Sequence, residues 1–415
     1  MEGLDPLYRR VAGIDVHRML HVVTAVIEHP DGTIEQTSRQ FGGFRRDCRA
    51  LSQWLVELDV ELAVMESTGI YWKSLYSNLD RAGLETWVVN AHFVKHVPGR
   101  KTDMSDSQWL AVLARFGLVR GSFIPPQDLR ELRLLSRYRR KLNAMHTSEV
   151  NRLHKILDDG GIKLGGVVSD INGVSAREMV AGLIDGVCID KLLDMARGQL
   201  KLKRDDLQAA LEGDLTARHL FVLKHLHAHI DMLEHELAEL DAYILGAMAP
   251  YSWAHRLLQT IPGIDQIASA MILIEIGDDM RRFGCADRLA AWAALCPGNN
   301  ESAGKRKSGR TRKGNAIIRY ILCEGANAAR MTKSSLASKY KSLMVRKTHK
   351  KAIVAIAHKM IRVIYLMLTR KEPYRDAQVD YETMSAKKNA PRWIRQLKLI
   401  GQWPGKAPAV AAANM

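Results

Sequence analysis

Four carboxylates within the first 106 residues have the placement expected of a divalent-metal site. Asp15 lies late in one apolar run, and Glu66 ends another. Asp103 and Asp106 are three residues apart at the start of a helical pattern, which puts them on one helix face. Oxygen ligands suit Mg²⁺ or Mn²⁺ rather than Zn²⁺, and two such ions can hold the attacking and leaving oxygens of a phosphodiester. Each acid alone has a simpler explanation, as a helix cap or a surface charge at a strand end.

A serine near the C-terminal third of the chain lies in a segment of small and cationic residues. Ser302 is followed by Ala303 and Gly304, which let a ligand approach the backbone closely. A serine hydroxyl needs a base or a charged site to become a nucleophile, and no histidine lies close in sequence. Taken alone, Ser302 is therefore better explained as a loop hydroxyl. The cations that could bind a phosphate or nucleic acid here are Lys305, Arg306, Lys307, Arg310, Arg312 and Lys313.

Positive charge is concentrated around this serine. The chain of 415 residues has 61 Lys and Arg against 45 Asp and Glu, for a net charge of +16. Residues 301–351 contain 15 Lys and Arg and 2 Glu, and so hold most of that excess. This pattern predicts a polyanionic partner, most simply nucleic acid. A solvated basic tail is the alternative, but the apolar helical runs within this zone argue against it.

The overall composition excludes several classes of protein. With 47% hydrophobic and 26% charged residues, the chain has the composition of an ordinary globular protein rather than a disordered or fibrous one. We find no secretory leader and no apolar run that approaches the length of a membrane span. The five cysteines are scattered, which is typical of reduced thiols. We therefore expect a cytoplasmic protein without a membrane partner.

Residues 9–124 are expected to form an α/β domain that positions the acids. Three strand patterns are followed by helix, strand, helix, strand and helix, which predicts a mixed sheet. This order matches the ribonuclease-H-like arrangement, in which the first strand lies beside the fourth. Asp15 and Glu66 would then emerge next to each other.

Residues 127–250 are expected to be mostly helical. Seven apolar residues with alternating spacings of three and four predict a coiled-coil seam that joins chains into an oligomer. The alternative is one amphipathic helix packed on its own domain. The seam consists of Leu223, Leu226, Ile230, Leu233, Leu237, Leu240 and Ile244.

Residues 255–372 are expected to form an α-rich C-terminal domain, followed by a tail at 373–415. Pro262 and Gly263 suggest a helix-hairpin-helix-like turn. The N-terminal amides of the next helix could then face a phosphate.

Together these motifs resemble the IS110 family of DEDD transposases, in its IS1111 branch, over about residues 9–120 and 255–370. Each motif is short, but their order along the chain is specific. The motifs are Gly13-Ile14-Asp15, Met65-Glu66-Ser67-Thr68-Gly69, Lys101-Thr102-Asp103-Met104-Ser105-Asp106, Pro297-Gly298, Ser302-Ala303-Gly304-Lys305 and Lys313-Gly314-Asn315. Position 107 is serine where many members of the family have alanine.

The resemblance implies a RuvC-like domain, a coiled-coil middle and a C-terminal transposase domain. Asp15, Glu66, Asp103 and Asp106 would bind the metals, and Ser302 would attack a DNA phosphate and form a covalent link. The two groups would meet in a composite site formed by different protomers of a dimer or tetramer. A structured non-coding guide (bridge) RNA would pair with donor and target DNA. The protein would work in the bacterial cytoplasm, with the nucleoid when bound to DNA.

Two other functions fit the same residues. A metal-dependent, structure-specific nuclease such as a junction resolvase would activate water with its metals and leave Ser302 idle. A non-catalytic nucleic-acid-binding protein would need neither the acids nor the serine.

Overall fold

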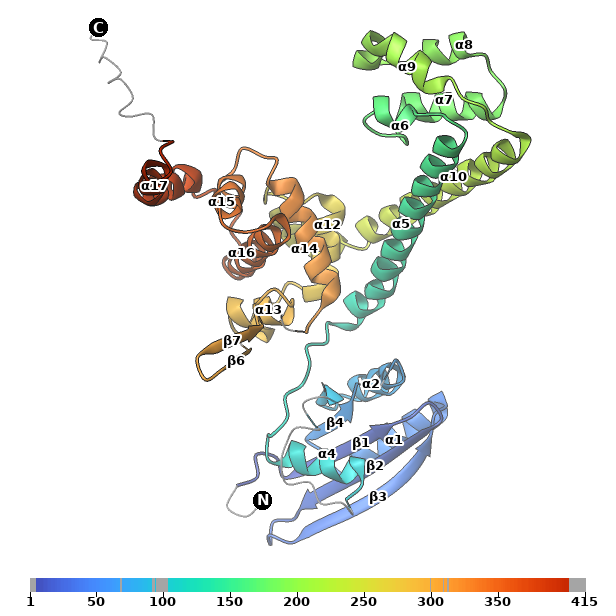
Figure 1. The fold of residues 1–415 in the computed structure, drawn as a ribbon. Helices are drawn as coiled ribbons and strands as arrows, with labels where there is room; N and C mark the ends of the chain where they lie inside the picture. The colour runs from blue at the N-terminus through green and yellow to red at the C-terminus, as the bar shows by residue number, and fades with distance from the viewer. Residues whose placement is uncertain are drawn as a thin grey trace. The chain divides into compact units, whose positions relative to one another are not determined.

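The computed structural model describes residues 5–67, 69–91, 94, 104–298, 300–308, 310–311 and 313–402. Asp103 and Arg312 lie outside the described residues. The chain divides into two compact units, Met1–Gln127 and Asp128–Met415, which we describe separately (Figure 1).

A mixed five-stranded sheet forms the centre of the N-terminal unit. Its strands are β1 (Arg10–Val16), β2 (Leu20–Glu28), β3 (Ile34–Gly42), β4 (Leu62–Glu66) and β5 (Thr86–Val89). The strand order is β3-β2-β1-β4-β5. Strands β1 and β3 both pair antiparallel with β2, whereas β1 and β5 both pair parallel with β4. The predicted pairing of the first strand with the fourth is therefore confirmed.

Helices cover both faces of this sheet. Successive side chains of a strand point to opposite faces, so β1 and β4 contribute to two separate cores. Ile14 and Met65 pack in the core that holds buried residues of α1 (Arg45–Glu57) and α2 (Trp72–Arg81). Val11 and Val64 pack on the other face against α4 (Asp106–Arg115).

Helix α4 lies directly on the backbone of β1. A Cβ built on Gly13 would be 2.1 Å from the Ser107 carbonyl oxygen and 2.4 Å from the Ala111 nitrogen. Only glycine permits this approach, which fixes the start of α4 against the end of β1 that carries Asp15.

Two long antiparallel helices dominate the first part of the second unit. Helix α5 (Gln127–Asp159) pairs with α10 (Ala217–Gly246), and Figure 1 shows them side by side. In the ion pairs between the two helices, the residue numbers on α10 decrease as those on α5 increase. The helices are therefore antiparallel. The pairs are Arg139–Asp241, His146–Glu234 and Asp159–His219. The segment between the helices holds α6 (Leu164–Val167), α7 (Val174–Ile184), α8 (Ile189–Asp194), η1 (Gly198–Lys203) and α9 (Arg204–Leu211).

The apolar seam of α10 packs within its own chain. Its buried members are Leu223, Leu226, Ile230, Leu233 and Ile244. The first three share a core with Leu153 and Leu157 of α5 and with α7, α8 and α9. The structure thus supports the alternative of an amphipathic helix packed on its own domain. These five side chains are therefore covered by other residues of the same chain.

In the residues that the structure describes, the regular elements of the rest of the second unit are helices and one small hairpin. Its helices are α11 (Ser252–Leu258), α12 (Gln266–Ile276), α13 (Ala286–Trp292), α14 (Ala316–Ala329), α15 (Ser335–Met344), α16 (His349–Arg370) and α17 (Tyr381–Leu399), with the short η2 (Ala249–Tyr251) and η3 (Met280–Arg282). Strands β6 (Asn300–Ser302) and β7 (Lys305–Ser308) pair between α13 and α14. Helix α17 lies in the segment expected to be a tail.

Helix α16 is long and apolar enough to cross a membrane, by length and composition alone. Its most apolar window has a mean hydropathy of 1.6, and half of that window is buried inside the protein. The sequence analysis found no apolar run of such length, and α16 is the one helix of the described residues that reaches it. Ile356, Ile361 and Ile364 are core residues, and the core helix of a globular protein passes the same test.

Candidate functional site

Asp15 and Glu66 lie side by side at one edge of the sheet. Gly13 pairs with Val64 in the parallel β1–β4 ladder, so the acids two residues further on are level with each other. The Val64 side chain faces α4, and so does the position that a Cβ on Gly13 would occupy. Because side chains alternate along a strand, Asp15 and Glu66 point to that same face from strands about 4.8 Å apart.

Helix α4 brings Asp106 to this edge. The helix runs antiparallel to β1, because its last residue, Arg115, accepts a hydrogen bond from the Leu7 backbone N–H before β1 begins. The Arg115 guanidinium also pairs with Glu28 at the end of β2, at 2.7 Å. Asp106, the first residue of α4, is therefore at the end of the helix nearest Asp15.

The first turn of α4 is held by hydroxyl groups that the sequence analysis did not recognise. Ser107 is buried, and its Oγ lies 2.9 Å from Thr24 Oγ1 on β2. Ser105 caps the helix by accepting a hydrogen bond from the Gln108 N–H. The departure from alanine at position 107 thus provides a polar contact between α4 and the sheet. Only the Ser-x-x-Gln capping pattern was visible in the sequence.

A histidine contacts the first acid. His17 Nε2 lies 3.0 Å from Asp15 Oδ2. The Asp15 side chain keeps a quarter of its surface exposed, and His17 more than half. One carboxylate oxygen is thus held by the ring while the group remains open to a ligand.

The donors at this edge fit a hard divalent cation in kind. All three described acids offer carboxylate oxygens, the ligands that Mg²⁺ and Mn²⁺ prefer. Among the described residues, however, no three His, Cys, Asp or Glu side chains form a group ready to hold an ion. Asp103, the fourth expected ligand, lies outside that part of the chain.

Ser302 ends the first strand of the small hairpin. In the β6–β7 register it is paired with Lys305, and Ala303 and Gly304 form the turn between them. Both turn residues have positive φ, 49° and 73°, and both are exposed. Consecutive positive φ angles are typical of the tight turns that suit a twisted hairpin. The backbone beside Ser302 is therefore at the tip of the hairpin.

Backbone contacts close the base of the hairpin. The Gly298 N–H donates to the Arg310 carbonyl at 2.7 Å, and Pro297 and Thr311 form an isolated bridge. Gly314 lies against the end of α13, since a Cβ there would be 2.5 Å from the Trp292 carbonyl oxygen.

Two of the six predicted cations have described exposure. Arg310 and Lys313 are exposed at the base of the hairpin. Lys305, Arg306 and Lys307 are placed by backbone register along β7.

The expected helix-hairpin-helix-like turn forms between α11 and α12, but its contacts differ from those expected. Gly263 has a φ of 85°, and a Cβ there would be 2.3 Å from the Gly325 carbonyl oxygen of α14. Asp265 caps α12 by accepting a hydrogen bond from the Ala268 N–H at 2.7 Å. A carboxylate of the chain therefore already occupies the helix end that was expected to face a phosphate.

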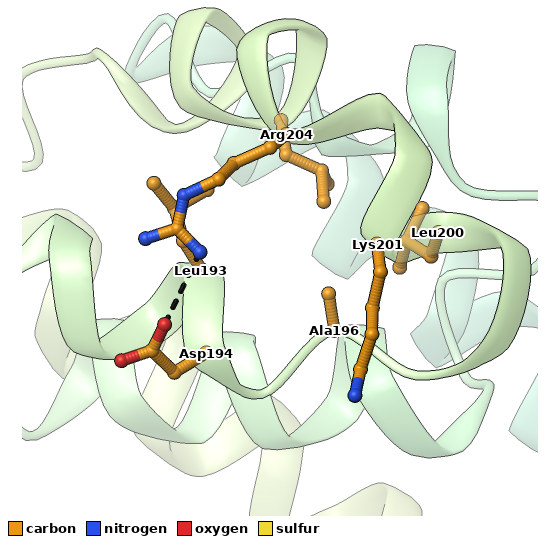
Figure 2. Close-up of a pocket in the computed structure, with 7 residues that line it drawn as sticks. Leu193, Asp194, Ala196, Leu200, Lys201 and Arg204 are labelled. Carbon is orange, nitrogen blue, oxygen red and sulfur yellow. Dashed lines mark hydrogen bonds and ion pairs between the residues drawn. The ribbon is translucent and has the colours of Figure 1, made fainter.

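A separate pocket of about 220 Å³ lies among α8, η1 and α9. Figure 2 shows Arg204 reaching across it to Asp194, with 3.2 Å between Nη1 and Oδ1. None of the predicted site residues lines this pocket.

Comparison with known proteins identifies the family. Residues 12–161 match the DEDD transposase model of the IS110 family, and residues 255–341 match the transposase IS116/IS110/IS902 family. The chain is 25% identical over 335 residues to the transposase for insertion sequence element IS1111A of Coxiella burnetii, covering 77% of this chain and 81% of the relative. It is 24% identical over 322 residues to a "probable family 20 transposase" of Pseudomonas aeruginosa, covering 76% and 86%. The chain therefore belongs to the IS110 family of transposases and is a DNA transposase enzyme.

Proposed function

We propose that this transposase cuts and rejoins DNA with metal-binding carboxylates in its N-terminal unit and a serine nucleophile in its C-terminal unit. One observation carries the proposal. Three acids from different elements, Asp15 on β1, Glu66 on β4 and Asp106 on α4, lie at the same edge of the sheet. The strand order and the parallel β1–β4 pair also support a ribonuclease-H-like fold, in which such an edge carries nuclease acids.

Asp15, Glu66, Asp103 and Asp106 would hold Mg²⁺ or Mn²⁺. When bound, the cations supply Lewis acidity that stabilises the negative charge developing on the phosphate oxygens. The chain's own part is to orient the acids. His17 holds one oxygen of Asp15, and the contact of α4 with Gly13 sets the position of Asp106.

Ser302 would attack the phosphorus of the scissile linkage. A bond forms between serine oxygen and phosphorus while the bond to the departing strand breaks. The serine proton is released, and the departing oxygen takes one up. Attack by another DNA end reverses these changes, so that the energy of the phosphodiester is kept for rejoining. The place of Ser302 beside an exposed two-residue turn supports this role.

The cations of the hairpin and its base would hold the DNA backbone. They are Lys305, Arg306, Lys307, Arg310, Arg312 and Lys313. Phosphate contacts of this kind position the nucleic acid but do not read its sequence. Sequence choice would come from a non-coding guide RNA that pairs with donor and target DNA, while the protein recognises shape and charge.

The working form would be a homo-oligomer in the bacterial cytoplasm, so that acids and serine from different protomers meet on one linkage. The seam residues Leu223, Leu226, Ile230 and Leu233 are buried within the chain, so these four residues would not join the protomers. The guide would be identified by sequencing RNA that copurifies with the protein from its host. An RNA encoded beside the transposase gene is the expected result, and random cellular RNA would contradict guidance.

Replacement of the serine tests the proposal directly. We expect Ser302→Ala to bind DNA like the wild type but to form no protein-linked DNA, whereas Ser308→Ala, in the same hairpin, should keep the link. If Ser302→Ala cleaves fully and the wild type forms no link, the enzyme is a hydrolytic nuclease. If Asp15→Asn also leaves every activity unchanged, the acids are not catalytic.

A further inference from the structure

A buried carboxylate outside the proposed catalytic groups is bonded to the segment that follows the β6–β7 hairpin, which carries Ser302. Glu275 lies on α12 in the apolar segment Ile272–Ile276, and its side chain has no exposed surface. Burial of a charged group is costly unless it has partners. Three side chains surround this one, namely Asn315, Arg133 and Arg137.

Asn315 connects Glu275 to the base of the hairpin. Its Nδ2 donates to Glu275 Oε2 at 2.6 Å. Its Oδ1 caps α14 by accepting hydrogen bonds from the N–H groups of Ile317 and Ile318. Its backbone N–H donates to the Trp292 carbonyl at 2.8 Å. One residue thus joins α12, α13 and α14 at the point where the chain leaves the hairpin.

Two arginines of α5 complete the cluster. Arg133 Nε lies 3.3 Å from Glu275 Oε2, and its Nη2 donates to the Glu275 carbonyl at 2.6 Å. Arg137 Nη2 lies 3.5 Å from Oε1. Burial lowers the pKa of Arg133 to about 10, although the Glu275 charge opposes that change. Arg133 therefore keeps its charge at neutral pH, and its contacts with the side chain and the carbonyl of Glu275 anchor α5 to α12.

Both ends of the hairpin depend on this region. The first strand follows α13, and the segment after the second strand returns to the end of α13 through Gly314 and Asn315. In the described residues, the base of the hairpin is also held by the Gly298–Arg310 hydrogen bond, the Pro297–Thr311 bridge and a hydrogen bond from Arg319 Nη1 to Thr311 Oγ1 at 3.2 Å. A shift of Asn315 would therefore be passed on to the hairpin that carries Ser302.

We propose that Glu275 is a positioning residue for Ser302, acting through its hydrogen bond with Asn315. This inference rests on the proposed nucleophilic role of Ser302. The hydrogen bond fixes the returning end of the hairpin on α12, and the two arginines hold the carboxylate in place. Correct orientation of a nucleophile is a large part of catalysis, and small displacements reduce the rate strongly.

An exchange of donor and acceptor tests the contact itself. Asn315→Asp keeps an oxygen that can cap α14, but it sets two carboxylates against each other. We expect formation of the serine–DNA link to fall at least tenfold while DNA affinity changes less than twofold. Glu275→Gln keeps an acceptor for Asn315 but loses the charge that holds Arg133, so a decrease of about threefold is expected. In the double variant, the amide introduced at position 275 can donate to the carboxylate introduced at position 315, and the rate should recover to the level of Glu275→Gln.

The control is Glu324→Gln, which removes an exposed carboxylate on α14 and should leave the rate unchanged. Hydrogen exchange of segments 292–298 and 313–318 supplies a readout independent of DNA chemistry. It should accelerate at least fivefold in Asn315→Asp and return in the double variant.

Recovery of both rate and exchange in the double variant supports the proposal. A fully active Asn315→Asp enzyme overturns it, as does a loss that Glu275→Gln fails to rescue. If exchange changes as expected but the wild type forms no serine–DNA link, the proposed function fails, and the positioning role fails with it.

Discussion

Replacing Gly13 with alanine should uncouple α4 from the sheet and displace an acid without removing it. The new Cβ would lie 2.1 Å from the Ser107 carbonyl oxygen and 2.4 Å from the Ala111 nitrogen. Both atoms belong to helix backbone and cannot rotate away. An ordinary contact at this position begins near 3.4 Å, so α4 must move by about 1 Å or more.

The structure sets the size of both effects. Overpacking of a tight contact costs about 1–3 kcal/mol of folding free energy. Because α4 begins with Asp106, the same shift would move that carboxylate relative to Asp15 and Glu66. A misplacement of about 1 Å reduces catalytic rates by roughly 100-fold.

The assay combines chemical denaturation with metal-dependent DNA cleavage at a temperature where the variant remains folded. Gly166→Ala is the control, because its Cβ would meet nothing within 4 Å. We expect the control to match the wild type in both measurements. A Gly13→Ala protein with wild-type stability and cleavage would refute the inferred contact of α4 with β1.

Three further predictions concern the α5–α10 helix pair and the positive charge of the protein. Leu233→Asp should lower the free energy of unfolding by about 3–5 kcal/mol, because the Leu233 side chain on α10 is only 1% exposed. A thermal unfolding curve identical to that of the wild type would contradict this burial. Burial acts to raise the pKa of Glu234, but hydrogen bonds from Arg177, Asn172 and His146 outweigh burial and lower this pKa. The ionised Glu234 therefore stabilises the fold above the pKa that it has in the unfolded chain. This stabilisation is lost as the pH falls through its pKa in the folded protein. Glu234→Gln should therefore flatten the acid side of the stability profile measured by thermal unfolding, and an unchanged profile would exclude this contribution. DNA affinity should decrease steeply between 50 and 200 mM salt, by roughly 10³-fold if about six phosphates are contacted, whereas a flat titration would place binding away from the basic zone.

The sequence predicted the features of the acidic edge that depend on element order and strand period. The order of strands and helices was enough to place β1 beside β4, and it followed that Asp15 and Glu66 would emerge next to each other. The cap of α4 is Ser105, whereas the sequence analysis had considered only an acid as the cap of this helix. The order of elements along the chain is a pattern that a single sequence carries well.

Contacts between distant segments were not readable. Glu275 appeared only as one acid within an apolar run, and nothing nearby indicated that Asn315 and Arg133 would meet it. The heptad spacing of α10 looked the same for pairing with another chain as for packing on α5, because spacing defines an apolar face but not its partner. Helix α17 escaped notice because none of its residues is buried, and Pro391 lies inside it.

The central claim is that the acids and Ser302 act on the same DNA linkage, and peptide mapping of trapped DNA tests it most directly. The wild type and Asp15→Asn would be incubated with Mg²⁺ and cleavable DNA, digested, and analysed by mass spectrometry for a nucleotide-bearing peptide. The account predicts an adduct on the peptide that contains Ser302 in the wild type, and none in Asp15→Asn or without a divalent cation. Cleaved DNA with no adduct in the wild type, or an equal adduct in Asp15→Asn, would contradict it.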